Sequence, residues 1–106
     1  VVTNHGGRQL DGSLSAIRAL QRIAPAVAGR TTVLFDSGIR RGTDIVKALA
    51  LGADAVLSAR ATLYGVATAG EAGAGRVLDL LAEELKRNLQ LMGCDDINAL
   101  DSRWLC

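Results

Sequence analysis

Residues 33–60 read VLFDSGIRRGTDIVKALALGADAVLSAR and contain two short apolar runs, each followed by a turn that carries an arginine. The runs at 33–35 and 53–57 are apolar and partly β-branched, which predicts buried strands. Between them, Thr43 is a suitable helix N-cap, apolar residues follow at helical spacing, and Gly52 stands where the residue after a helix belongs. The order strand, helix, strand predicts parallel strands whose carboxyl ends meet at one edge.

The two turns after these strands bring phosphate-binding chemistry to that edge. Backbone N–H groups freed by a glycine turn, helix N-termini and an arginine fork all favour a dianionic phosphate. A single arginine after a buried strand is more often a solvated loop residue. Because two adjacent turns each carry one, Arg40 and Arg60, the sequence predicts a phosphate site.

Composition argues against several classes of function. The 106 residues are 49% hydrophobic with a formal charge of +1, which suits one α/β domain and gives no basic field for nucleic acid. No apolar stretch approaches the roughly 18 residues needed to span a bilayer. Cys94 and Cys106 are too few for a disulfide scaffold and lack metal-ligand spacing with His5, the single histidine. We therefore expect no metal centre, and reduced thiols in a cytosolic protein.

A second chemical motif lies near the start of the chain, where residues 5–13 read HGGRQLDGS. Residues 1–4 have the pattern of the last half of a buried strand and no initiator methionine precedes them, so we expect the chain to start inside a domain. An imidazole at a strand end suits a general base, and Arg8 offers a planar fork for a carboxylate. The alternative is a structural role, with His5 bonded to a neighbouring loop and Arg8 in water.

The remaining segments predict helices. Residues 15–24 are amphipathic, and Pro25 is expected to kink or end that helix. Residues 61–69 predict a short helix and residues 71–92 a longer one. The predicted helix stops are Gly70 and Gly93. The apolar stripe predicted to be buried on the long helix consists of Val77, Leu78, Leu81, Leu85, Leu89 and Met92.

The chain is thus predicted to form a single partial domain, residues 1–106, with about three βα units, a C-terminal helix and a short tail at 95–106. Such units build a doubly wound sheet or a closed (β/α)8 barrel, and a barrel needs about 250 residues. A phosphate held by the last two βα turns is typical of the end of a barrel, and no Gly-x-Gly-x-x-Gly or Walker signature favours the other architecture. The predicted fold class is α/β, the C-terminal part of a TIM (β/α)8 barrel.

Three motifs resemble one family of enzymes. NHGGRQLD at 4–11, DSGIRRGTD at 36–44 and KALALGA at 47–53 are similar to the C-terminal portion of the FMN-dependent 2-hydroxy acid dehydrogenases and oxidases. The resemblance covers essentially the whole chain, and its first motif is the most specific. Features nearer to the mandelate and lactate dehydrogenase branch are Ser37, ATLYG at 61–65 and CDDI at 94–97.

The resemblance implies FMN-dependent oxidation of a small (S)-2-hydroxy acid, of mandelate, lactate or glycolate type, to the 2-oxo acid. It implies that His5 is the active-site base and that Arg8 binds the substrate carboxylate. The electron acceptor, whether oxygen, a quinone or a cytochrome, depends on residues outside this chain. The residues implied to hold the ribityl and phosphate portions of FMN are Asp36, Ser37, Gly38, Ile39, Arg40, Ala59 and Arg60.

The resemblance also implies properties of the complete protein. A lysine near the flavin ring, substrate-binding tyrosines and an aspartate that orients the histidine belong to earlier strands of the family. We therefore expect this fragment alone to be inactive and to associate through an exposed sheet edge. The complete protein is implied to be a homotetramer, in the cytoplasm or at the inner membrane through a segment outside this chain.

One position departs from the family pattern, which usually has Gly-Arg where this chain has Ala59 and Arg60. A methyl group there crowds the phosphate, or strains the backbone if a positive φ is required, so we expect weaker FMN retention than in a glycine homologue. Two alternatives stay open. One is another phosphate-binding TIM-barrel enzyme, such as an isomerase or a dehydrogenase of nucleotide metabolism, which needs no pair like His5 and Arg8. The other is a non-catalytic fragment that packs or binds flavin weakly.

Overall fold

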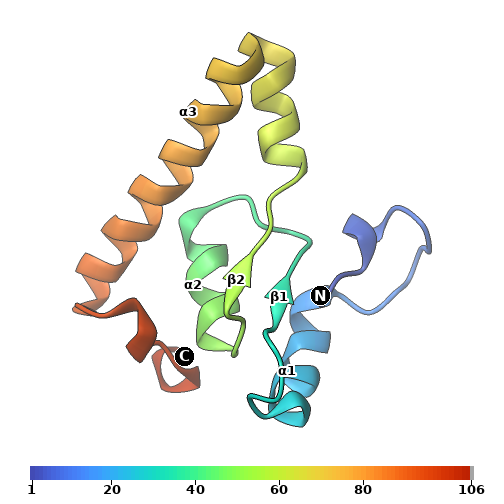
Figure 1. Ribbon diagram of the computed structural model, residues 1–106, viewed down its shortest axis with the longest axis vertical. Coiled ribbons are helices and arrows are strands. Elements are labelled where there is room, and N and C mark those ends of the chain that lie inside the picture. Colours follow the sequence, from blue (N-terminus) through green and yellow to red (C-terminus); the bar gives the residue numbers. More distant parts are fainter. Residues whose placement is uncertain (106) are drawn as a thin grey trace.

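The computed structural model describes residues 1–105, in which helices and strands alternate along the chain (Figure 1). The predicted reduced state of Cys106 lies outside the described residues, whereas Cys94 is a buried free thiol. The mixed order of elements is the α/β class that the sequence predicts. In chain order the elements are η1 (His5–Gly7), α1 (Ala16–Val27), β1 (Leu34–Phe35), α2 (Gly42–Ala50), β2 (Ala55–Val56), α3 (Arg60–Met92), η2 (Ile97–Ala99) and η3 (Ser102–Trp104).

The strands are short and parallel. Leu34 lies opposite Ala55 in the ladder between β1 and β2. Val2 forms a parallel bridge to Phe35 on the other side of β1, where the Val2 N–H donates to the Leu34 carbonyl at 2.7 Å. Within the described residues, neighbouring strands therefore follow the order of the chain, as the predicted βα units require. The strand predicted at the start of the chain is reduced to the bridge at Val2.

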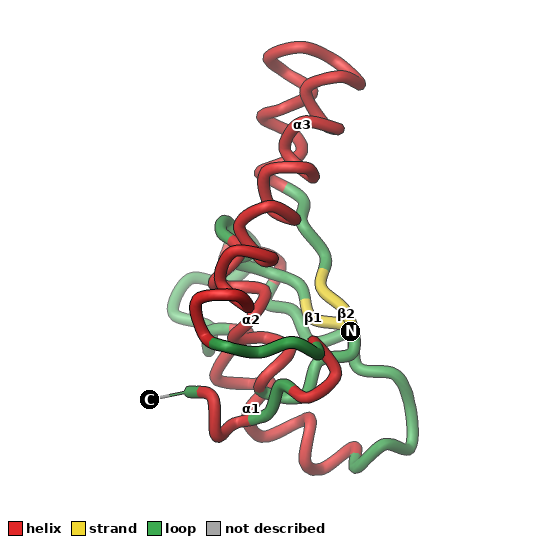
Figure 2. The backbone as a smooth tube through the Cα atoms, turned by 90° about the vertical axis from the view of Figure 1, so that its left-hand side faces the viewer, coloured by secondary structure: helices red, strands yellow, loops and turns green. Residues whose placement is uncertain are grey.

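The core lies between the strands and the helices. Phe35 and Leu20 are the largest fully buried side chains, and Ile45 and Leu81 belong to the same apolar cluster. Figure 2 shows α1 and α2 on one side of the strands. On the opposite face of the sheet, Leu57 just after β2 is 44% exposed. The sheet is thus covered on one face and open on the other.

Helix α3 consists of two arms that meet at a sharp bend, as the top of Figure 1 shows. The bend falls at Ala69 and at Gly70, which has φ 59° and ψ −140°. The arms touch through glycines, since a Cβ built on Gly65 would lie 2.5 Å from the carbonyl oxygen of Gly73. The predicted pair of helices is confirmed, and so is the stop at Gly93, which has φ 73°.

The structure corrects two predicted helix boundaries. Helix α2 starts before Thr43, with Arg41 as its N-cap, because the Asp44 carboxylate accepts the N–H groups of Arg40 and Arg41 at 3.0 Å. Helix α1 continues past Pro25 to its end at Val27. The missing proline N–H removes only one bond of the last turn, so the helix tolerates it.

The predicted apolar stripe of α3 is wrong in extent. Leu81 is buried, but Leu78 remains 54% exposed. The members of the stripe that pack on the core are Val77, Leu81 and Leu85, which recur every four residues and form a narrower face than predicted. No helix in residues 1–105 has the length and apolar character needed to cross a membrane.

Candidate functional site

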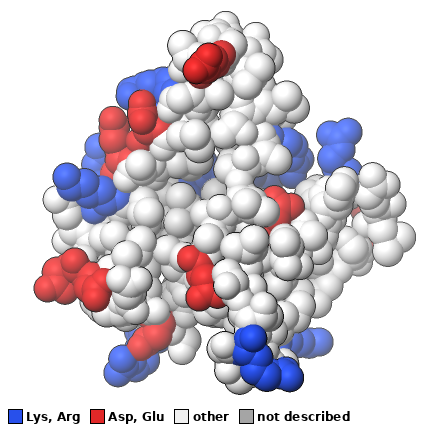
Figure 3. Space-filling view, viewed as in Figure 1, with Lys and Arg blue, Asp and Glu red and all other residues white. Residues whose placement is uncertain are grey.

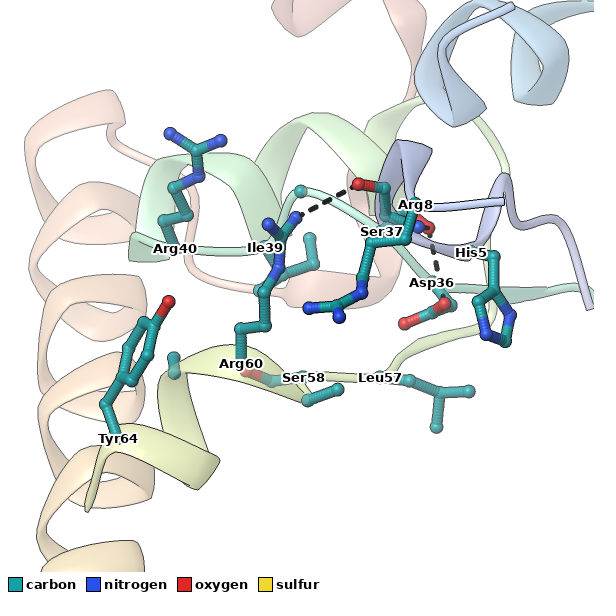
Figure 4. A pocket seen from close by; sticks show the side chains of 14 residues that line it. His5, Arg8, Asp36, Ser37, Ile39, Arg40, Leu57, Ser58, Arg60 and Tyr64 are labelled. Atoms are coloured by element: carbon teal, nitrogen blue, oxygen red, sulfur yellow. Dashed lines mark hydrogen bonds between the residues drawn. The ribbon is translucent and has the colours of Figure 1, made fainter. Parts of the chain in front are cut away.

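A cavity of about 570 Å³ lies at the carboxyl ends of β1 and β2 (Figure 4). Three segments form it: the loop around η1, the turn after β1, and the turn that leads from β2 into α3. All of the residues that the sequence singled out for chemistry line this one cavity. They are His5, Arg8, Asp36, Ser37, Gly38, Ile39, Arg40, Ala59 and Arg60.

The cavity lining is rich in positive charge. Arg8, Arg40 and Arg60 contribute guanidinium groups, whereas Asp36 is the one carboxylate among the lining residues of the described chain. Figure 4 shows the Arg40 guanidinium directed away from that of Arg60. Three guanidinium groups among the lining residues favour an anionic ligand. Elsewhere, Figure 3 shows acidic and basic side chains mixed along α3.

Backbone groups at the cavity add to this preference. Helix α3 begins at Arg60 on the cavity wall, and the N–H groups of a first helical turn lack partners within the helix. In the turn after β1, Gly38 has φ 85°, and a Cβ built there would meet no atom within 4 Å. The space beside Gly38 is therefore open to a ligand that approaches the backbone.

Only one of two adjacent arginines faces the cavity. Arg40 lines it, whereas the Arg41 Nε atom donates to both carboxylate oxygens of Glu84 on α3, at 2.9 and 3.1 Å. The Gly42 N–H donates to the same carboxylate at 2.8 Å. The side-chain bond from Arg41, followed by the Gly42 N–H, lowers the pKa of Glu84 below its ordinary value. This clamp between α2 and α3 holds the Arg40 turn in place.

The backbone of Ala59 corrects one predicted reason for weak cofactor binding. Ala59 has φ −107° and ψ −65°, so an L-residue adopts this conformation without the strain of a positive φ. The crowding of a phosphate by the methyl group stays a prediction. The main difference from a glycine at this position is thus volume, not backbone freedom.

The histidine loop is held by contacts from both turns. His5 is exposed and has φ 57°, a left-handed conformation that is uncommon for a residue with a side chain. The Arg60 Nη2 atom donates to the Gly6 carbonyl at 3.4 Å. The His5 backbone N–H donates to the Thr3 Oγ1 atom at 3.0 Å, and no hydrogen bond joins the His5 ring to another group within residues 1–105. The catalytic role of His5 and the structural alternative both stay predictions.

Tyr64 is a prominent residue of the cavity that the sequence motifs did not assign to the site. Tyr64 lines it from the first turns of α3, and Figure 4 shows its hydroxyl directed toward the cavity. The signal was present, because Tyr64 follows Arg60 by four residues and such residues share one face of a helix. Leu57 and Ser58 complete this wall.

Comparison with known proteins places the chain among flavin enzymes. Residues 1–106 match the family of FMN-dependent dehydrogenases over their full length. The chain belongs to this family. It is 51% identical over 105 residues to an L-lactate oxidase from Nostoc sp., which corresponds to 99% of this chain and 29% of that protein.

Solved structures agree with this assignment. A soluble mutant of the membrane-associated (S)-mandelate dehydrogenase from Pseudomonas putida matches with a TM-score of 0.89 and 52% identity, over 97% of this chain and 29% of that one. A putative lactate oxidase from Pediococcus acidilactici matches with a TM-score of 0.91 and 44% identity, over 95% of this chain and 28% of that one. The chain thus spans less than a third of the length of these relatives.

Proposed function

We propose that this chain is the C-terminal part of a (β/α)8 barrel and supplies the cofactor-phosphate turns, the base and the carboxylate-binding arginine of a 2-hydroxy acid oxidoreductase. The complete enzyme oxidises a small (S)-2-hydroxy acid, of mandelate, lactate or glycolate type, to the 2-oxo acid. The observation that carries this proposal is the single cavity in which His5 and Arg8 meet the turns of Arg40 and Arg60.

The barrel is supported by the arrangement of the strands. Val2, β1 and β2 are parallel neighbours in chain order, and the helices cover one face. The other face, on which Leu57 is exposed, suits the interior of a barrel that further strands complete. Family relatives more than three times as long provide room for those strands.

The residues at the cavity fit the phosphate end of FMN. Arg40 and Arg60 supply charge, the first turn of α3 supplies N–H groups, and the open space beside Gly38 allows close approach of a ligand. The Asp36 carboxylate and the backbone of Ser37 lie beside them, where hydroxyl groups of the ribityl chain would bind. When bound, FMN accepts two electrons from the substrate α-carbon, as a hydride or through a carbanion.

The chain's own residues handle the proton and the orientation of the substrate. The His5 imidazole accepts the proton of the substrate hydroxyl, because its ring nitrogens are free and the ring stands at the cavity. Arg8 binds the substrate carboxylate through its planar fork, which turns the α-carbon toward the cofactor side.

The test uses His5→Gln in the complete protein, with FMN content measured by absorbance. We expect turnover to fall by a factor on the order of 10² to 10⁴, as for loss of a general base, while FMN stays bound. Arg8→Lys should lower kcat/KM because an ammonium cannot reproduce the fork. Gln9→Ala, beside them but outside the cavity lining, is the control. Undiminished turnover of His5→Gln would favour another phosphate-binding barrel.

Substrate and assembly are tested on the same preparation. Lactate, glycolate and mandelate, each assayed with an artificial dye, separate the substrate types, and oxygen, a quinone and a cytochrome separate the acceptors. We propose that the complete protein is a homotetramer in the cytoplasm or at the inner membrane. Light scattering and fractionation of cells measure both properties. A colourless protein that turns over none of the three acids would instead favour a non-catalytic fragment.

A further inference from the structure

Two hydroxyl groups bind three consecutive backbone amides of the histidine loop. The Ser37 Oγ atom accepts the Asn4 N–H at 3.4 Å and the Gly6 N–H at 3.1 Å. The Thr3 Oγ1 atom accepts the N–H of His5, the residue between them, at 3.0 Å. The backbone around His5 is thus attached on one side to its own strand end and on the other to the turn after β1.

The two hydroxyls are themselves oriented by a carboxylate. Thr3 donates to the Asp36 Oδ2 atom at 2.6 Å, and Ser37 reaches the same oxygen at 3.3 Å. The Thr3 and Ser37 oxygens lie 3.0 Å apart. Because their protons point toward Asp36 or toward each other, their lone pairs are available to the amides. The cluster of Thr3, Asp36 and Ser37 therefore accepts donors from the loop in a fixed direction.

The conformation that this cluster holds is an unusual one. His5 has φ 57° and Ser37 has φ 93°, and both are residues with a side chain in the left-handed region. Such conformations are disfavoured for these residues and persist where surrounding contacts over-determine them. Here the contacts come from segments more than 30 residues apart.

We propose that Thr3 and Ser37 are positioning residues that set the backbone under His5 and so aim its imidazole at the substrate. The inference rests on the proposed role of His5 as the base. It assigns Ser37 a function in catalysis beyond any contact with FMN, since its hydroxyl is bonded to the histidine loop and to Asp36. The turn that faces the cofactor phosphate is in this way attached to the loop that carries the base.

The test begins with a matched pair at one position, Ser37→Ala and Ser37→Gly, in the complete FMN-loaded protein. Both variants lose the hydroxyl, but glycine adopts the positive φ without strain and should fold even if alanine does not. We expect kcat to fall roughly tenfold in both, the size of one lost hydrogen bond, with KM and the FMN dissociation constant within about threefold of the wild type. If the glycine variant kept wild-type kcat, the role of the hydroxyl would be disproved.

Thr3→Val tests the second hydroxyl with nearly the same volume. We expect a similar loss of kcat. In the double variant with Ser37→Gly, kcat should fall by less than the product of the two single fold-decreases, because both hydroxyl groups hold one loop. Thr31→Val and Ser102→Ala, two exposed hydroxyl residues outside the cavity lining, should leave kcat unchanged.

A readout independent of turnover separates this inference from the role of His5. Hydrogen exchange of the amides of residues 4–6 should accelerate in Ser37→Gly and Thr3→Val, but not in the two controls. Faster exchange with unchanged kcat would overturn the positioning role while leaving His5 as the base. Equal losses of kcat and of FMN binding would also overturn it, because they indicate a general structural effect. Turnover that survives His5→Gln would instead refute the proposed function itself.

Discussion

The two turns that carry Arg40 and Arg60 at the cavity differ in backbone conformation. After β1, Ser37 and Gly38 are both left-handed, and Arg40 stands outside the helix that follows. After β2, Ala59 has a negative φ and the chain enters α3 directly at Arg60. One turn is a loop between two elements, whereas the other is the first turn of a helix.

The turn after β1, here the first turn, and the turn after β2, the second turn, obtain their rigidity from different sources. The first turn depends on distant partners: Ser37 binds the histidine loop, and the α2 start that follows Arg40 is clamped by Glu84. The second turn depends on its own helix, where the Leu63 N–H bonds the Ala59 carbonyl at 2.9 Å. Mutations at long-range contacts should therefore affect the first turn more than the second.

The largest expected effect is on the clamp of the first turn. A Cβ at the buried Gly42 would lie 2.5 Å from the backbone carbonyl carbon of Glu84, so Gly42→Ala must push α2 away from α3. We expect the complete protein to lose about 3 kcal/mol of unfolding free energy, measured by urea titration.

A matched control for this substitution lies on α3. Gly75 is exposed and a Cβ there would meet nothing within 4 Å, so Gly75→Ala should gain about 0.5–1 kcal/mol from helix propensity. Equal stability of the two variants would show that the α2 start is not tightly packed.

The next effect concerns FMN binding by Arg40 and Arg60. Arg40→Ala and Arg60→Ala should each weaken FMN binding by about 10- to 100-fold, the loss of about 1.5–3 kcal/mol from a charged hydrogen bond. Fluorescence titration of the apoprotein measures this. Arg60→Ala should in addition lower kcat, because Arg60 also bonds the Gly6 carbonyl. Identical effects of both substitutions on kcat would argue against a contact between the second turn and the histidine loop.

A smaller effect concerns acid stability. The Glu84 carboxyl has a lowered pKa in the folded protein, so its contribution is present above its unfolded value of about 4.3 and is lost as pH falls through the lower folded value. Glu84→Gln should be less stable than the wild type at neutral pH, and the difference should shrink below about pH 4. Thermal melts from pH 7 to pH 3 measure it. Glu83→Gln, at the neighbouring exposed ion pair, is the control, and a gap that stays constant with pH would contradict the clamp.

The smallest effect is expected at Ala59. Because its φ is negative, Ala59→Gly should not relieve backbone strain, and the gain in FMN affinity from a smaller side chain should be at most a few-fold. A flavin titration against the wild type checks this. FMN binding that is more than tenfold tighter in Ala59→Gly would show that the methyl group of Ala59, rather than its backbone, limits FMN affinity at the second turn.

Much of the fold and of the site followed from local sequence patterns. Strand, helix and strand in residues 33–60 and the helix ends at Gly70 and Gly93 depend on short-range steric preferences, which neighbouring residues set by themselves. The gathering of candidate residues at one edge also followed, because parallel βα units place every strand end on the same side.

Tertiary structure decided what depends on partners far along the chain. Nothing near Arg40 and Arg41 indicates which one turns to the cavity, since the partner of Arg41 is Glu84, more than 40 residues away. The same holds for the left-handed Ser37, whose hydroxyl accepts two N–H groups from the start of the chain. The sequence alone determined which elements and chemical groups are present, whereas long-range hydrogen bonds and packing decided which side chain faces the ligand.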